Sequence, residues 1–227
     1  MDKKQLTKLL TYFTLGDGGV YYSGNNCRFV MNMLEANRDY VEWVSSVLNE
    51  VTEAKIRVVK DEREGRKPTL NITTKTHPTF TTLRDRIYTD NYKGLDPHSL
   101  KLLDFEALSI LYMCDGSLYT EKPNPKKGLV SESYNVTLNM KRLSYGDQFI
   151  LKKALKDNLG LEWNIIRHGK YFFLRLRGKD VQKFMLGVAP YIKPSFSYKL
   201  IRTVSPVLTG DDIVCASQEC EEVSRND

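Results

Sequence analysis

An internal repeat is the feature of this sequence that most limits how it can fold. An apolar stretch ending in Asp-Gly occurs twice, as LTYFTLGDG at residues 10–18 and as LSILYMCDG at residues 108–116. A short extended segment follows each copy, and then a stretch carrying Asn-Met that ends at Met33 in the first copy and at Met140 in the second. Two copies of one unit therefore account for nearly all of the chain.

Both copies predict the same order of elements, which is helix, strand, strand, helix, strand, strand, helix. Apolar residues recur with a helical period in some stretches and alternate with polar residues in others. In KPTLNITTK, for example, Leu70 and Ile72 alternate with Asn71 and Thr73. Four such strands in each copy would form a sheet with one apolar face, which packs against the helices, and one polar face.

We therefore predict an α+β fold of two pseudo-symmetric αββαββα repeats. Each repeat has a curved antiparallel four-stranded sheet, and the repeats join through the two helices that end in Asp-Gly. The first repeat spans residues 1–100, the second spans 101–204, and residues 205–227 are expected to form an acidic, mobile tail. The segment TEKPNPKKG at residues 120–128 occurs only in the second copy and is expected to be an extended loop or hairpin tip.

Charge is distributed unevenly along the chain. Residues 1–119 hold 16 basic and 16 acidic residues, residues 120–204 hold 17 and 6, and residues 205–227 hold 1 and 6. A basic body is typical of a protein that binds nucleic acid, because neutralising phosphates releases counterions. On charge alone, a solvated basic surface fits equally well.

The polar faces of the predicted sheets repeat Lys, Arg, Asn, Thr and aromatic side chains. For one strand, ordinary exposure to solvent explains such a face. Repetition over several strands favours a nucleic-acid surface, because a β-ribbon fits the major groove and these side chains bond base edges and phosphates. The residues predicted to contact nucleic acid are Arg28, Asn32, Lys55, Arg57, Lys67, Asn71, Thr73, Lys75, Asn135, Thr137, Asn139, Lys141, Arg167, Tyr171, Arg175 and Arg177.

Each Asp-Gly pair lies where an apolar helix is expected to stop, since Gly accepts the left-handed conformation that ends helices. A carboxylate at a helix C-terminus is disfavoured by up to about 1 kcal/mol unless a cation offsets it. A simple turn explains one such pair, but not two at corresponding positions of a duplicated unit. If the helices pack about a pseudo-twofold axis, the small Gly16 and Cys114 allow close approach. Asp17 and Asp115 would then converge in an arrangement suited to oxygen-liganded Mg²⁺.

The two nine-residue motifs resemble those of the LAGLIDADG homing endonucleases in their monomeric, two-repeat form. The order of elements extends the resemblance over residues 5–203, but the motifs carry its specificity. Leu15 and Met113 replace the first acid of the name-giving string, whereas the terminal acid and Gly are kept in both copies. The resemblance implies one metal-binding Asp on each interface helix and two sheets that straddle DNA. It also implies a cut in both strands that leaves short 3′ overhangs.

This resemblance implies a site-specific double-strand DNA endonuclease that uses Mg²⁺ or Mn²⁺. A Tyr-Lys pair ends each repeat, and its Lys is a candidate for positioning water or stabilising charge; phosphate contact or solvation would explain these lysines equally well. None of the three His residues has a His at the corresponding position of the other copy, which argues against a nuclease that uses His in catalysis. The residues implied in catalysis are Asp17, Asp115, Lys93 and Lys199, with the metal held by Asp17, Asp115 and the backbone carbonyls of Gly16 and Cys114.

Two other functions remain open on this fold. One is an RNA-binding intron maturase, alone or combined with cleavage, and the other is a catalytically inactive DNA-binding regulator. Retention of both terminal acids argues against the regulator. The sequence has no Gly-rich phosphate loop, nucleophile elbow or HExxH motif, so an unrelated enzyme that acts on small molecules is the least supported of the candidate functions.

The sequence also indicates in which compartment the protein acts and whether it needs a protein partner. No apolar run approaches the roughly 18 residues that span a bilayer, and the N-terminus has no signal-peptide pattern, so we expect neither a membrane protein nor a secreted one. The four Cys form no CxxC pair, which favours reduced thiols. We expect an intracellular reducing compartment, either the cytoplasm of a bacterium or phage-infected cell or an organelle matrix. Because both repeats lie in one chain, we expect a monomer that needs no protein partner.

Overall fold

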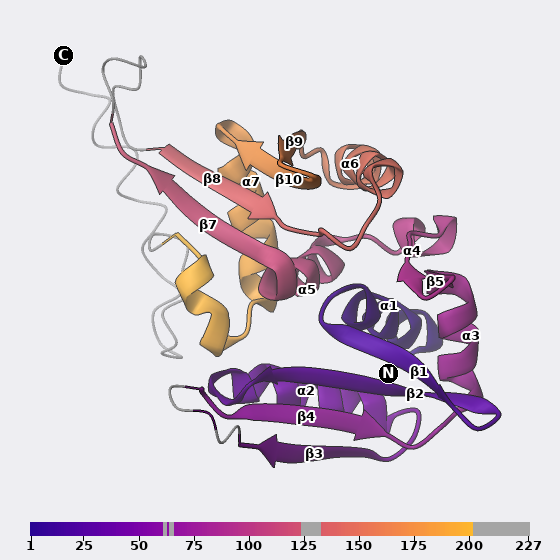
Figure 1. Cartoon of the computed structure of the whole chain (residues 1–227). Helices are drawn as coiled ribbons and strands as arrows, with labels where there is room; N and C mark the ends of the chain where they lie inside the picture. Colours follow the sequence, from indigo (N-terminus) through magenta and orange to yellow (C-terminus); the bar gives the residue numbers. More distant parts are fainter. Residues whose placement is uncertain (61–62, 64–65, 124–132, 202–227) are drawn as a thin grey trace, which may run out of the picture.

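Two antiparallel four-stranded sheets lie on opposite sides of a central pair of helices (Figure 1). The computed structural model describes residues 1–60, 63, 66–123 and 133–201. The helices are α1 (Lys3–Leu15) and α5 (Phe105–Asp115), which carry the two Asp-Gly motifs at their C-terminal ends. The predicted α+β fold is therefore confirmed. Most of the loop predicted at residues 120–128, and the tail predicted at 205–227, lie outside the described residues.

The elements of the two repeats follow the predicted order. In the first repeat they continue with β1 (Gly18–Ser23), β2 (Asn26–Leu34), the 3-10 turn η1 (Glu35–Asn37), α2 (Arg38–Asn49), β3 (Ala54–Val59), β4 (Thr69–Thr74) and α3 (Pro78–Ile87). In the second they continue with β7 (Gly116–Glu121), β8 (Ser133–Leu138), α6 (Tyr145–Leu159), β9 (Asn164–His168), β10 (Tyr171–Arg177), α7 (Lys179–Val188) and the 3-10 turns η3 (Ala189–Tyr191) and η4 (Pro194–Lys199).

The segment between the repeats contains elements that sequence periodicity does not predict. A two-stranded hairpin, β5 (Tyr88–Thr89) and β6 (Tyr92–Lys93), precedes the short helix α4 (Pro97–Lys101). Its turn residues Asp90 and Asn91 have φ angles of 47° and 69°, a conformation that Asn and Asp tolerate better than most residues. The hairpin brings Lys93 back toward the end of α1.

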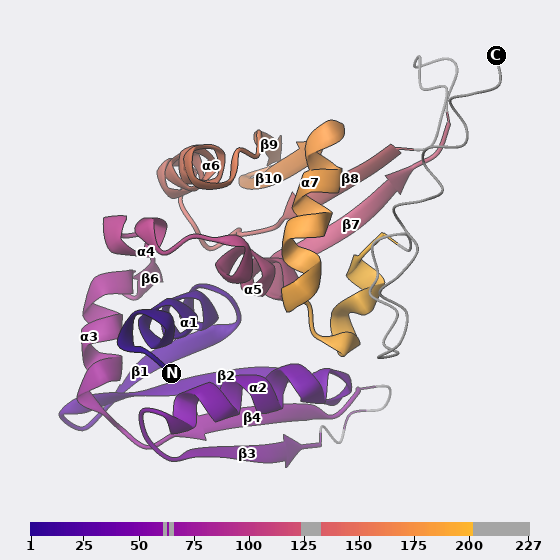
Figure 2. The ribbon, with the colours of Figure 1, turned by 180° about the vertical axis from the view of Figure 1, so that it is seen from behind.

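The strand order is the same in both sheets, β1-β2-β4-β3 in the first and β7-β8-β10-β9 in the second. Helices α2 and α7 lie behind the strands in Figure 1 and in front of them in Figure 2, so both sheets are covered on the same side. The predicted alternation holds on β4, where Leu70 and Ile72 are fully buried and Asn71 and Thr73 are partly exposed. It holds on β10 as well, where Leu174 and Leu176 are buried. The other face of each sheet is therefore polar.

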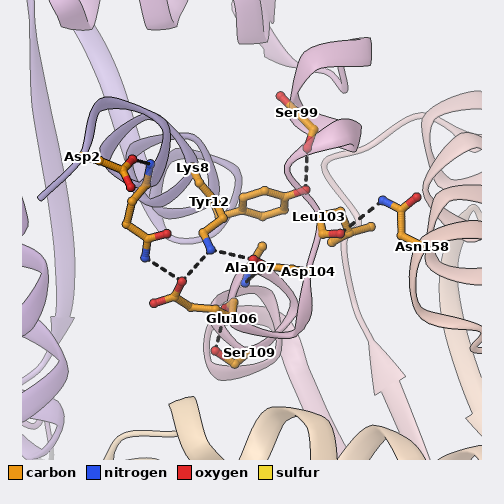
Figure 3. A network of polar contacts seen from close by, with 11 residues as sticks. Asp2, Lys8, Tyr12, Ser99, Leu103, Asp104, Glu106, Ala107, Ser109 and Asn158 are labelled. Atoms are coloured by element: carbon orange, nitrogen blue, oxygen red, sulfur yellow. Dashed lines mark hydrogen bonds and ion pairs between the residues drawn. The ribbon is translucent and has the colours of Figure 1, made fainter.

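The two central helices are also tied together at their N-terminal ends (Figure 3). The Nζ of Lys8 on α1 lies 2.6 Å from Oδ2 of Asp104 and 2.7 Å from Oε2 of Glu106. Gln5 Nε2 donates to the same Glu106 oxygen at 2.7 Å. Asp104 is also the N-cap of α5, because its Oδ1 accepts from the backbone N–H of Ala107 at 2.9 Å. This network fixes how the two helices lie against each other.

The glycines of the two Asp-Gly pairs do not stop the helices in the predicted way, because α1 already ends at Leu15 with Gly16 as its cap and only Gly116 caps its helix, α5. Neither Gly18 nor Gly116 adopts the left-handed conformation, because each is the first residue of the following strand. Glycine is required there by close packing. A Cβ on Gly18 would lie 2.6 Å from the carbonyl oxygen of Phe13, and one on Gly116 would lie 2.5 Å from that of Tyr112. The expectation of a left-handed helix stop was therefore wrong.

None of the helices among the described residues combines the length and the apolar character needed to cross a membrane.

Candidate functional site

The two repeated acids lie where the central helices end. Gly16 caps α1 and precedes Asp17, and Asp115 is the last residue of α5. The helices approach so closely at this end that a Cβ on Gly16 would lie 2.7 Å from Sγ of Cys114. Small residues before both acids therefore permit the approach that the sequence suggested.

The negative charge of Asp17 affects the ionisation of Asp115. Burial, and then the negative charge of Asp17, raise the pKa of Asp115 to about 6. The positive charges of Arg142, Lys93 and Lys199 oppose this shift, in that order. A raised carboxyl pKa means that the local positive charge does not fully offset burial and the second carboxylate. The site would therefore favour an added cation.

The two repeat-related lysines bind the backbone at the ends of these helices. Lys93 Nζ donates to the carbonyl oxygens of Gly16 at 2.9 Å and of Gly18 at 2.6 Å. Lys199 Nζ donates to the carbonyl oxygens of Tyr112 at 3.1 Å and of Met113 at 2.6 Å. Both lysines thus lie beside the acids, and each holds one helix end in place.

The surroundings of the lysines lower their pKa. Burial, and then the positive charge of Arg142, lower the pKa of Lys93 to about 8. Burial lowers the pKa of Lys199, whose side chain is 8% exposed and lies over the rings of Phe196 and Tyr112. A lysine with a lowered pKa exchanges its proton more readily near neutral pH.

Cys114 contributes packing rather than a charged sulfur. Its Sγ lies 3.4 Å from the hydroxyl of Tyr40, which is fully buried. Burial, and then the charge of Asp17, raise the pKa of the Cys114 thiol to about 12. The thiol therefore stays neutral, which leaves the carboxylate and backbone oxygens as the candidate ligands here.

The donor set fits a hard divalent cation. Two carboxylates and neighbouring backbone carbonyls are oxygen ligands, which Mg²⁺ and Mn²⁺ prefer. Among the described residues no group of three or more His, Cys, Asp or Glu could hold a metal, so a cation held by Asp17 and Asp115 would need further oxygen ligands from the backbone, water or a substrate. Mg²⁺ is commonly bound by one or two carboxylates together with water and substrate phosphates. The carbonyl of Gly16 already accepts from Lys93, but a carbonyl oxygen has a second lone pair.

Arg142 is a site residue that sequence reasoning missed. Its positive charge lowers the pKa of both Asp115 and Lys93. It also lines a cavity of about 480 Å³ together with Lys93, Lys141 and Tyr92. The signal was present in the sequence, because a Lys-Arg pair directly follows the Asn-Met of the second copy but not that of the first.

The polar face of the first sheet is an ordered set of rows across three strands. Arg57, Asn71 and Asn32 face one another on β3, β4 and β2. Asn71 Nδ2 donates to Asn32 Oδ1 at 2.8 Å, and Thr73 donates to Asn71 Oδ1 at 2.8 Å. Lys55 occupies the next row, opposite Thr73. The structure thus brings these five predicted residues together on one face.

The remaining predicted residues of the first repeat lie around these rows. Arg28 is exposed on β2, next to β1. Lys67 is exposed just before β4. Lys75, just after β4, pairs with Glu53 at 2.6 Å, and Lys55 pairs with the same carboxylate at 3.2 Å. A phosphate would compete with Glu53 for these two cations.

The second sheet presents a row formed by Thr137 on β8 and Arg175 on β10, which face each other. The Nε of Arg175 is buried and has no hydrogen-bond partner in the described part of the chain. Asn139 lies in line with Thr137, and its Nδ2 lies 3.5 Å from the Thr137 hydroxyl. Lys141 and Tyr171 are exposed near one end of this sheet, with Lys141 Nζ 5.6 Å from the Tyr171 ring.

Asn135 departs from its predicted exposure. Its side chain is only 2% exposed, because Arg177 Nε donates to its Oδ1 and Glu121 lies against its amide. It therefore supports Arg177, which is itself exposed, rather than standing open to a ligand. Arg167 is exposed on β9, and its Nε donates to the carbonyl oxygen of Gly169 at 3.0 Å.

Comparison with known proteins identifies the class. The LAGLIDADG DNA endonuclease family matches residues 11–184, which include both Asp-Gly motifs and both sheets. The chain belongs to this family.

Solved structures support the same fold. The homing endonuclease I-WcaI bound to its DNA recognition sequence is similar with a TM-score of 0.73 and 20% identity, over 88% of this chain and 87% of that one. The LAGLIDADG meganuclease I-AabMI bound to uncleaved DNA is similar with a TM-score of 0.55 and 16% identity, over 82% of this chain and 84% of that one. At this identity the likeness establishes the fold.

Curated relatives carry the name Protein RecA. The relative from Mycolicibacterium flavescens is 28% identical over 204 residues, which is 85% of this chain and 47% of the relative. The relative from Mycolicibacterium chitae is 27% identical over 195 residues, which is 82% of this chain and 44% of the relative. The chain spans about half the length of the curated relatives it matches, so their name describes proteins of which it covers only a part.

Proposed function

We propose that the protein is a site-specific DNA endonuclease that cuts both strands of a long, asymmetric duplex site with the help of Mg²⁺ or Mn²⁺. The observation that carries this proposal is the convergence of Asp17 and Asp115 at the ends of two packed helices, where the charge of one acid raises the pKa of the other. Two such acids between two polar sheets are suited to phosphodiester hydrolysis.

Hydrolysis adds water across the bond between phosphorus and the 3′ oxygen. The water oxygen joins the phosphorus, a proton goes to the 3′ oxygen, and a 5′ phosphate and a 3′ hydroxyl result. A bound divalent cation would lower the pKa of the attacking water and stabilise the charge on the leaving oxygen. Asp17 and Asp115 would hold it, with the Gly16 and Cys114 carbonyls nearby.

The lysines would act on the same phosphates. Lys93 and Lys199 donate to carbonyls that flank the acids, so their ammonium groups lie where negative charge develops. An ammonium fixed by two hydrogen bonds needs little reorganisation, which is the basis of electrostatic stabilisation of a transition state. As the family resemblance implies, the cuts on opposite strands would be staggered and would leave short 3′ overhangs.

The two polar sheet faces supply the DNA surface in this proposal. The Asn and Thr rows of the first sheet can bond base edges, and Arg175 and Arg177 of the second can bond guanines or phosphates. I-WcaI and I-AabMI were solved bound to DNA, and the shared fold supports the same use of the sheets here. Both half-sites are read by one chain, so the protein would act as a monomer.

A plasmid library with a randomised insert tests the proposal. Incubation with the protein in Mg²⁺, followed by recovery and sequencing of linear molecules, should yield one long asymmetric site. Asp17→Asn and Asp115→Asn should each reduce linear product by orders of magnitude while leaving folding and DNA binding intact, because each removes one charged ligand. Lys101→Ala, an exposed residue on α4, is the control variant.

The outcomes distinguish the three candidate functions of this fold, which are nuclease, DNA-binding regulator and RNA maturase. Cleavage lost in both Asn variants but kept in the control supports the nuclease. Wild-type rates in both Asn variants would overturn the mechanism. Specific DNA binding without cleavage would indicate a regulator, and binding of RNA in place of DNA would indicate a maturase.

A further inference from the structure

Each candidate lysine lies on a segment that the opposite repeat holds. The backbone N–H of Ser195, in η4 of the second repeat, donates to Oδ2 of Asp39 on α2 of the first at 3.0 Å. The backbone N–H of Leu95, which follows β6 of the first repeat, donates to Oδ1 of Asp147 on α6 of the second at 3.3 Å. Because α2 and α6 occupy the same place in their repeats, one kind of contact is made twice.

Neighbouring contacts join the same elements. On the segment of the second repeat, Lys193 Nζ lies 4.2 Å from the centroid of the Trp43 ring on α2. On the segment of the first repeat, the carbonyl oxygen of Leu100 accepts from Asn158 Nδ2 on α6 at 2.9 Å. Both segments therefore lie against the middle helix of the opposite repeat over several residues.

Within these segments, which are residues 93–100 and 193–199, the lysine bonds its own repeat. Lys93 donates to two carbonyl oxygens at the end of α1 and the start of β1. Lys199 donates to two carbonyl oxygens near the end of α5. Each ammonium group is therefore placed by two anchors, one on each repeat. A change in how the repeats dock would move the lysines relative to the acids.

Asp39 uses one carboxylate oxygen for its own helix and the other for the opposite repeat. It lies in the first turn of α2, where its Oδ1 accepts from the backbone N–H of Tyr40 at 2.8 Å. Its Oδ2 is the acceptor for Ser195. A hydrogen bond to a carboxylate is about twice as strong as one between neutral groups. The side chain of Asp39 therefore joins α2 firmly to the segment that carries Lys199.

We propose that Asp39 and Asp147 are positioning residues, which hold Lys199 and Lys93 beside the acids through the segments that carry these lysines. Each centre is then complete only while the two repeats are docked on each other. The inference rests on the proposed nuclease function. Each aspartate acts through its lysine, and a shift of about 1 Å in a group that acts on the transition state can cost about a hundredfold in rate.

Single-turnover cleavage tests the role of Asp39. With the protein in excess over the selected target duplex in Mg²⁺, the rate reports the chemical step rather than binding. Asp39→Ala should lower this rate by about ten- to a hundredfold, and should leave the affinity for the duplex in chelator near that of the wild type. Glu42→Ala, which removes an exposed carboxylate from the same helix, is the matched control and should change neither.

A double-mutant cycle shows whether Asp39 acts through Lys199. Lys199→Met keeps an apolar side chain in the buried position but removes the ammonium group. If the lysine carries the effect, Asp39→Ala added to Lys199→Met should lower the rate no further. Losses that multiply would show that Asp39 supports the fold independently of Lys199, and would overturn the positioning role. A wild-type rate in Lys199→Met alone would overturn it as well.

The same test applies to Asp147, with a control for the helix cap. Asp147 also forms the capping box of α6 with Ser144, so Asp147→Ala removes both the cap and the contact with Leu95. Ser144→Ala breaks the same capping box and keeps the carboxylate. Asp147→Ala should therefore slow cleavage more than Ser144→Ala does. Equal rates in the two variants would assign the effect to the cap and contradict the anchor.

Hydrogen exchange measures the anchor without cleavage. Loss of the acceptor for the Ser195 N–H should raise exchange in peptides that cover residues 193–199 in Asp39→Ala, but not in Glu42→Ala. Unchanged exchange in Asp39→Ala would refute the anchor, whether or not the protein cuts DNA.

The failures of the two proposals are distinguishable. If the wild-type protein cuts no member of the library, the nuclease function itself fails, and hydrogen exchange still shows whether the anchor exists. If the wild type cuts and Asp39→Ala cuts at the same rate, the nuclease stands and the positioning role is overturned. Melting temperatures of all variants show whether a lost rate comes from an unfolded chain.

Discussion

Gly16 and Cys114 touch across the interface of the two repeats at the position where the central helices end. A Cβ built on Gly16 would lie 2.7 Å from Sγ of Cys114, which is closer than real Cβ atoms pack, and 3.1 Å from its Cβ, which is tighter than most real contacts. The distance between the acids that follow these residues therefore depends on the size of two small side chains. Substitution here should affect both stability and cleavage.

Gly16→Ala should destabilise the protein by about 1–3 kcal/mol, the usual cost of overpacking a core. Cys114→Gly in the same chain should restore part of this loss, because it removes both contacting atoms. Urea unfolding of the wild type, both single variants and the double variant gives the coupling free energy. Additive effects of the two substitutions would show that the contact does not limit the approach of the helices.

Lys8→Met should destabilise the protein by about 2 kcal/mol. Lys8 is 11% exposed and neutralises Asp104 and Glu106, so its loss leaves two carboxylates without their cation. The expected cost is below the roughly 3–5 kcal/mol of a fully buried pair, because the Asp104 side chain is 51% exposed. Adding Glu106→Leu should recover part of the stability. Thermal unfolding measures both, and an unchanged melting temperature for Lys8→Met would contradict the role of the network.

Arg177→Ala should reduce affinity for the selected DNA site by about 1–3 kcal/mol if Arg177 reads a base, and should relax preference at one position. If Arg177 contacts a phosphate, affinity should fall about equally for all sequences, with a smaller salt dependence. Fluorescence anisotropy with single-base variants of the site separates these cases. Lys101→Ala on α4 is the matched control, and equal behaviour of the two variants would remove Arg177 from the DNA surface.

The repeat made most of the fold predictable. Alternating burial on β4 and β10 follows from the sequence because one face of each sheet packs on helices, and the same pattern occurs in both copies. The two acids could be located because a carboxylate at a helix end is unusual and occurs twice. These features depend on local periodicity and on position within the repeat, which a sequence displays directly.

Features that depend on contacts between repeats were not predictable in this way. The need for glycine at Gly18 and Gly116 depends on how closely strand and helix pack, which no local pattern records. Asn135 has a polar side chain on an alternating strand, but Arg177 from a strand far along the chain covers it. Arg142 enters the site because the segment after β8 lines the same cavity as the hairpin that carries Lys93, which brings distant parts of the chain together.

Asp115→Asn should remove a pH dependence of stability in the absence of divalent metal. Burial and Asp17 raise the pKa of Asp115 to about 6 in the folded protein, above its value in an unfolded chain. The folded state therefore holds the proton more tightly, and the stability this provides is present below about pH 4 and is lost as the pH rises through about 6. Asn does not titrate, so the variant should gain up to about 3 kcal/mol relative to the wild type between pH 4 and pH 7. Urea unfolding in chelator measures this, Lys101→Ala serves as the control, and a pH-independent difference would show that Asp115 ionises as an ordinary surface carboxyl.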